Sequence, residues 1–158
     1  MNPSDILKYG HTFFLKSLAV VPTEHRTDPG ACGRWSVQDL LAHITSYEWV
    51  LVEILENLQT PCPTPTLDEF KAGGEFNDAQ VDRRQGMTYE AVLAEYDHAH
   101  ARVRTLVAQL PAAVWQQNGV LPWYGAAYDL EDFIVYTYYG HKREHGGQIQ
   151  VFRDRFVG

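Results

Sequence analysis

Residues 129–158 read DLEDFIVYTYYGHKREHGGQIQVFRDRFVG, and this stretch predicts the last long helix of the chain. Asp129 and Asp132 have the spacing of a capping box, in which each side chain bonds to the backbone amide of the other residue. From there the pattern predicts one buried face along the helix. The residues that form this apolar and aromatic stripe are Phe133, Val135, Tyr136 and Tyr139.

His141 and His145 lie four residues apart inside this helix. Residues at that spacing are offset by about 40° around the helix axis and by one turn along it, so both imidazoles leave the same face and could bind one metal ion. Gly140, Gly146 and Gly147 flank the pair, although each costs a helix interior about 1 kcal/mol relative to alanine. Their presence indicates a close backbone approach. The alternative is a pair of ordinary surface or core histidines at a fraying helix end.

The composition is that of a globular protein of 158 residues with a formal net charge of −7. We expect one domain spanning residues 1–158. The 13 basic residues are scattered, which does not match a nucleic-acid-binding surface. No apolar run approaches the roughly 20 residues of a membrane span, and the start of the chain lacks a signal peptide, so we expect a cytoplasmic protein without a membrane partner. Cys32 and Cys62 are expected to be free thiols.

Three further helices are predicted by apolar residues at helical spacing. They cover about residues 2–21, 36–59 and 89–110. Asn2 before a proline favours the start of the first helix, and Ser36 with Asp39 forms a second capping box. Four amphipathic helices, each with one apolar face, predict an all-α protein with the architecture of a four-helix bundle.

The connections between these helices are long. Residues 60–88 predict a binding loop or a short embedded helix near residues 67–71, with a further helix beginning near residue 76. Residues 111–128 contain Trp115, Trp123 and Tyr124. This aromatic segment favours a hydrophobic lid on one end of the bundle over a surface on which a ligand stacks, although both roles are compatible.

His43 lies on the apolar face of the second predicted helix. A histidine in that position is usually a hydrogen-bonded structural residue, but in helical bundles metal sites are assembled from facing helices. His43 is therefore a candidate third ligand beside His141 and His145. Three neutral imidazoles with an open position are typical of a catalytic zinc site. Without an acidic ligand Mg²⁺ and Ca²⁺ are disfavoured, while zinc, nickel, copper and iron remain open.

Two side chains are candidates for proton transfer. Tyr47 lies one turn beyond His43 on the same helical face, and Glu144 is adjacent to His145 in the sequence but points about 100° away from it. Gln148 follows His145 by three residues and could orient its imidazole. We therefore predict Tyr47 and Glu144 as catalytic residues and Gln148 as a residue that supports the metal site.

Several segments resemble the DinB-like four-helix-bundle superfamily, in particular its ClbS/DfsB-like branch. They are Trp35-Ser36, Leu41-Ala42-His43-Ile44, the region from Phe76 to Pro111, and the run from His141 to Ile149. The resemblance implies a divalent metal, typically zinc or nickel, held by His43, His141 and His145. It also implies relatives among transferases and isomerases that use a low-molecular-weight thiol cosubstrate, and a relative that opens a reactive cyclopropane to protect its host.

These observations predict a metal-dependent hydrolase or thiol transferase that acts on a small electrophilic metabolite. One alternative is a bundle that binds and sequesters a small molecule without turnover, and another is a structural homodimer. The motif H-x-x-E-H at residues 141–145 also fits an inverted zincin peptidase, with Glu144 as general base. That class needs a further acidic ligand downstream, and Asp154 is the only acid after His145.

Overall fold

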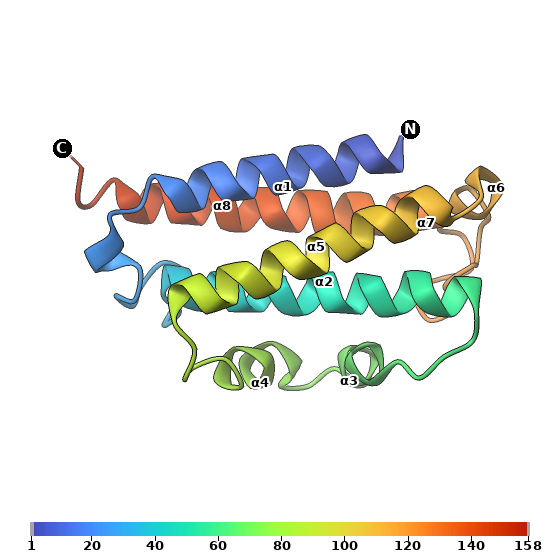
Figure 1. The fold of residues 1–158 in the computed structure, drawn as a ribbon, viewed down its shortest axis with the longest axis horizontal. Coiled ribbons are helices and arrows are strands. Elements are labelled where there is room, and N and C mark those ends of the chain that lie inside the picture. Colours follow the sequence, from blue (N-terminus) through green and yellow to red (C-terminus); the bar gives the residue numbers. More distant parts are fainter. Residues whose placement is uncertain (1, 158) are drawn as a thin grey trace.

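The computed structural model describes residues 2–157, and within this range it shows helices and no β-strand. The long helical segments lie side by side as a bundle (Figure 1). They are α1 (Pro3–Ala19), α2 (Val37–Gln59), α5 (Tyr89–Gln109) and a continuous stretch of α7 (Leu130–Ile134), η2 (Val135–Gly140) and α8 (His141–Arg153). The predicted all-α helical bundle is confirmed.

Local side-chain bonds explain where the helices begin. The Asn2 side chain accepts from the first turn of α1. Ser36 Oγ accepts from the Asp39 amide at 3.1 Å, and Asp39 Oδ2 accepts from the Ser36 amide at 2.8 Å. Asp129 and Asp132 form the same reciprocal pair at the start of α7. Each of these predicted caps is confirmed, because such bonds satisfy amides that a helix leaves unpaired in its first turn.

The connection from α2 to α5 lies along the outer side of α2 (Figure 1). It contains α3 (Pro65–Ala72) and α4 (Phe76–Asp82), which confirms the predicted embedded helix. The Glu53 carboxylate of α2 accepts from the amides of Thr66 at 3.1 Å and Leu67 at 2.7 Å. A carboxylate at a helix N-terminus is favourable, so Glu53 fastens α3 to α2.

The remaining connections contain little regular secondary structure. The first contains the turn η1 (Thr23–His25), and the aromatic segment before α7 contains α6 (Ala112–Trp115). Trp123 and Tyr124 pack on Phe133 with ring centroids 5.6 and 4.9 Å apart. This packing matches the predicted hydrophobic lid. Cys32 and Cys62 are free thiols, and no helix among residues 2–157 has the length and apolar character to cross a membrane.

The helices pack mainly as two pairs. α1 lies against α8, and α2 lies against α5, whereas direct contacts between α2 and α8 are sparse. The two helices that carry the predicted metal ligands therefore belong to different pairs. Side chains in the middle of the bundle therefore determine how α2 and α8 are rotated relative to each other.

The predicted apolar stripe of the last helix is wrong at Tyr136, which is 69% exposed, while Tyr138 is buried. Both tyrosines lie in η2, which is a π-helix. Tyr138 follows the buried Ile134 by four residues and continues its face of the helix. The extra residue in a π turn shifts the phase of the residues that follow it by about 100° relative to an α-helix. The π turn directly precedes His141.

Gly146 provides the close approach that the glycines predicted. A Cβ atom at this position would lie 2.4 Å from Phe13 Cε1 and 3.0 Å from Ser17 Oγ, both on α1. At Gly147 a Cβ atom would meet nothing within 4 Å. Of these two glycines, only Gly146 is therefore required by helix packing.

We expect Gly146→Ala to lower the free energy of unfolding by about 1–3 kcal/mol, because the added methyl group overpacks the α1–α8 contact. Gly147→Ala is the matched control, and it should raise the free energy by up to about 1 kcal/mol through helix propensity alone. Urea denaturation of both variants measures the difference. Equal changes in the two variants would contradict this account of the α1–α8 packing.

Candidate metal centre

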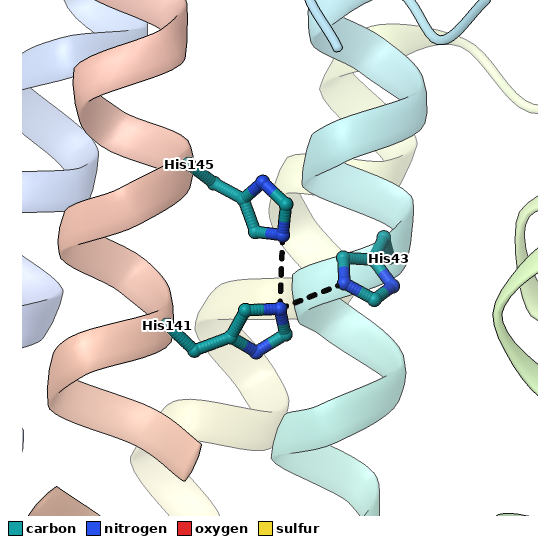
Figure 2. Close-up of side chains that lie close together, drawn as sticks. All are labelled: His43, His141 and His145. Atoms are coloured by element: carbon teal, nitrogen blue, oxygen red, sulfur yellow. Dashed lines mark hydrogen bonds between the residues drawn. The ribbon is translucent and has the colours of Figure 1, made fainter. Parts of the chain in front are cut away.

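The three histidines predicted as metal ligands come together between α2 and α8. His141 Nε2 lies 2.9 Å from His43 Nε2 and 2.9 Å from His145 Nε2 (Figure 2). One nitrogen atom from each ring lies within 4.8 Å of the others. The ring of α2 and the two rings of α8 point toward a common centre, as the spacing of the α8 pair and the core-facing position of His43 predicted.

The chemistry of these nitrogen atoms fits a cation. A neutral imidazole has one nitrogen that donates a proton and one that offers a lone pair. His141 Nε2 faces two other ring nitrogens and cannot form a full hydrogen bond with both. Nitrogen ligands at 2.0–2.1 Å from zinc are about 2.9–3.3 Å apart when their bonds to the ion make angles between 90° and 109°. The two 2.9 Å separations from His141 Nε2 are at the lower end of this range, and the nitrogens of all three rings lie within 4.8 Å of one another.

Burial keeps these imidazoles neutral. His43 is 2% exposed, and burial, reinforced by its two histidine neighbours, lowers its pKa to about 2. Burial and the proximity of His145 lower the pKa of His141 to about 3, and burial lowers the pKa of His145. At pH 7 all three rings are therefore in the form that can bind a metal without first losing a charge.

Neighbouring groups orient two of the rings. The Nδ1 atom of His145 lies 2.8 Å from Gln148 Oε1, so Nδ1–H donates to the amide oxygen and the Nε2 lone pair faces the cluster. His141 forms a hydrogen bond with the backbone of Thr137, which lies in the π turn. The Nδ1 atom of His43 is buried and has no hydrogen-bond partner among the described residues. Gln148 thus makes the contact that its spacing predicted.

A pocket of about 530 Å³ opens beside His141. Its walls come from α2, α3, η2 and α8, so the embedded helix of the long connection contributes directly. The lining side chains include Tyr47, Phe70, Tyr136, Thr137, His141 and Glu144. Glu144 is the only carboxylic acid among these lining side chains.

The two predicted catalytic side chains both reach this pocket. The Tyr47 ring lies 5.0 Å from the His43 ring and 4.5 Å from the His141 ring, and its hydroxyl donates to Asn77 Oδ1 at 3.3 Å. Burial raises the pKa of Tyr47, so its hydroxyl stays protonated at neutral pH. Glu144 is exposed and lines the same pocket.

Sequence reasoning missed a group of buried polar residues beside the histidines. Lys142 is 2% exposed and forms an ion pair with Glu48, which is fully buried. Lys142 follows the buried Tyr138 by four residues and so continues its face of the helix. Nothing in the sequence indicates this burial, because a lysine is almost never fully buried unless it is paired, and its partner is distant in the chain.

In a comparison with protein families, the model of the DinB superfamily matches residues 13–149. This range contains all three histidines and most of the chain, and the match does not distinguish branches of the superfamily. The searches of curated proteins and of solved structures found no match. The fold, the three-histidine cluster and the family match agree, and the chain belongs to the DinB superfamily.

Proposed function

We propose that this protein is a metal-dependent hydrolase or thiol transferase that acts on a small electrophilic molecule. The observation that best supports this is that three neutral imidazoles, two of them buried and that of His141 half-buried, converge beside an open pocket. His43, His141 and His145 would hold the ion. Zinc or nickel suits this set, because nitrogen ligands without a carboxylate favour such ions over Mg²⁺ or Ca²⁺.

When bound, such an ion supplies a water or thiol of lowered pKa. The chain's own residues supply the rest of the chemistry. The Glu144 carboxylate lines the pocket and can take up a proton, and the protonated Tyr47 hydroxyl can donate one. A low-molecular-weight thiol cosubstrate is part of the proposal, supported by the resemblance to the ClbS/DfsB-like branch.

The pocket supports an uncharged and partly apolar substrate. Tyr47, Phe70 and Tyr136 offer aromatic surface, and among residues 2–157 no lysine or arginine lines the pocket. Glu144 would repel an anionic substrate. The volume of about 530 Å³ suits a small molecule. The protein has a net charge of −7, and we propose that it acts in the cytoplasm without nucleic-acid or membrane partners. We also propose a homodimer, which a sizing experiment tests.

The inverted zincin alternative gains no support. The cluster contains no carboxylate ligand. Asp154 lies at the end of α8, where its carboxylate is exposed and pairs with Arg153. A peptidase of that class would need an acidic ligand near His145, so we do not propose this activity.

The test is a set of metal-dependent turnover assays. Zinc-loaded and nickel-loaded protein is incubated with epoxides, alkyl halides and activated esters, with and without a low-molecular-weight thiol. We expect turnover that a chelator removes. Glu144→Gln should lower kcat by about 100-fold or more, as for the loss of a general base, without changing metal content. Asp154→Asn, an exposed acid on the same helix, is the control and should have wild-type kcat.

Turnover that survives complete removal of metal would contradict the proposal.

A second candidate is a non-catalytic bundle that binds and sequesters a small molecule. The aromatic side chains of Tyr47, Phe70 and Tyr136 favour it, because they could bury a ligand without any metal chemistry. Ligands that quench tryptophan fluorescence, and are recovered unchanged from both metal-loaded forms, would support this second candidate instead.

A further inference from the structure

A layer of buried polar side chains crosses the middle of the bundle next to the histidine cluster. Its centre is the ion pair between Lys142 Nζ of α8 and Glu48 Oε1 of α2. The second carboxylate oxygen, Glu48 Oε2, lies 3.1 Å from His100 Nδ1 of α5. Burial opposes the charge of Glu48, but Lys142 and His100 outweigh it and lower the pKa of Glu48 to about 2.

The layer also includes α1. The His11 ring stacks on the His100 ring with centroids 3.7 Å apart and planes 3° apart. His11 Nδ1 lies 2.9 Å from the hydroxyl of Tyr96, whose ring faces the Lys142 ammonium group at 5.3 Å. All four long segments of the bundle therefore contribute a side chain to one connected layer, and the two helix pairs meet there.

A second contact joins the last helix to α2 one turn before Lys142. The Tyr138 hydroxyl donates to the backbone carbonyl of Tyr47 at 2.9 Å. Tyr138 and Lys142 are four residues apart on one face, and they contact the adjacent residues Tyr47 and Glu48. Tyr138 lies within the π turn, and both Tyr138 and Lys142 are buried in the core of the bundle.

Stability alone is a weak explanation for the buried ion pair. Removing two charges from water is costly, and apolar residues of similar volume often give equal or greater stability. What a directional pair adds is a defined alignment of its helices. Such alignment matters here, because α2 and α8 have sparse contacts of their own and yet carry the three converging imidazoles.

We infer that the Glu48–Lys142 ion pair and the Tyr138 hydrogen bond set the rotation and register of α8 against α2, and so position the imidazoles of the two helices opposite each other. This inference rests on the proposed metal site. A rotation of α8 by one residue, about 100°, would turn His141 and His145 away from His43. The pair thus acts through the ligand histidines rather than on the substrate.

The test compares two double variants of matched chemistry. Glu48→Gln/Lys142→Met removes the buried charges while keeping side-chain size and the acceptor for His100. The control, Arg84→Met/Glu95→Gln, removes a partly buried ion pair whose carboxylate also accepts from Trp49, away from the histidine cluster. Each protein is measured for Co²⁺ affinity by chelator competition, for its Co²⁺ absorption spectrum, and for thermal unfolding.

A metal-independent readout is the nuclear Overhauser effect between ring protons of His43 and His141, whose centroids are 4.8 Å apart. We expect Glu48→Gln/Lys142→Met to lose this signal, to bind Co²⁺ at least 10-fold more weakly and to change the Co²⁺ spectrum. The control should keep the signal and bind Co²⁺ within twofold of wild type, even if its unfolding temperature falls equally.

The inference is overturned if Glu48→Gln/Lys142→Met keeps the ring signal and binds Co²⁺ within twofold of wild type. If that variant does not fold, Tyr138→Phe replaces it, since it removes a single oxygen atom. We expect Tyr138→Phe to weaken Co²⁺ binding at least threefold, and unchanged binding would overturn the inference. If the wild-type protein shows the ring signal but binds no metal, the proposed function is refuted. The ring signal of the variants then still tests whether the ion pair positions the histidines.

Discussion

Replacing His141 with alanine is expected to abolish metal binding under conditions in which the wild-type protein is fully loaded. His141 Nε2 is the central atom of the cluster, 2.9 Å from the nitrogen of each partner ring. Without it, two imidazoles from different helices remain. Loss of a residue that merely supports a ligand costs about 10- to 100-fold in metal affinity, so loss of this ligand should cost at least about 100-fold.

The measurement is zinc and nickel affinity by chelator competition, on protein purified without a histidine tag. His98→Ala is the matched control, because His98 is an exposed histidine on α5 outside the cluster. It should bind metal like the wild type. An affinity of His141→Ala within threefold of wild type would show that the metal is held elsewhere.

The metal-free protein is expected to lose stability steeply as the pH falls below about 6.5. In the unfolded chain histidines titrate near this value, whereas in the fold burial lowers the pKa of His43 to about 2 and that of His141 to about 3. Below pH 6.5 the unfolded chain therefore binds more protons than the folded one. The free energy of unfolding must then fall with pH, and it continues to fall until the folded pKa values are reached.

Each such histidine contributes up to about 1.4 kcal/mol per pH unit, so His43 and His141 together should lower the free energy of unfolding by about 4 kcal/mol between pH 7 and pH 5. This is a large share of the 5–15 kcal/mol typical of folded proteins. Urea denaturation at pH 7 and pH 5 measures the change. The double variant His43→Phe/His141→Phe removes both groups and should show a clearly smaller loss. Equal losses in the two proteins would exclude these histidines as the cause.

Much of the fold could be predicted because its signals are local. The capping pairs Ser36–Asp39 and Asp129–Asp132 each act within one turn, so the sequence alone shows them. Apolar periodicity gave the long helices for the same reason. The histidine cluster could also be predicted, since His141 and His145 share a helical face by spacing and His43 lies on an apolar stripe.

What the sequence could not show depends on packing between distant segments. The π turn at Val135–Gly140 shifts the phase of the last helix, and nothing in its residues reliably distinguishes it from an α-helix. The burial of Lys142 depends on its ion pair with Glu48, which lies 94 positions earlier in the chain. The place of Phe70 in the pocket depends on how Glu53 fastens α3 to α2.

The most direct test of the central claim is X-ray absorption fine structure at the zinc edge of the loaded protein. We predict one zinc ion per chain, with a first shell of nitrogen and oxygen atoms only, at about 2.0–2.1 Å, and outer-shell scattering from three imidazole rings. The same spectrum for His141→Ala should lack this signature. Sulfur scattering at about 2.3 Å, or a shell with fewer than two imidazoles, would contradict the assignment of His43, His141 and His145 as the metal ligands.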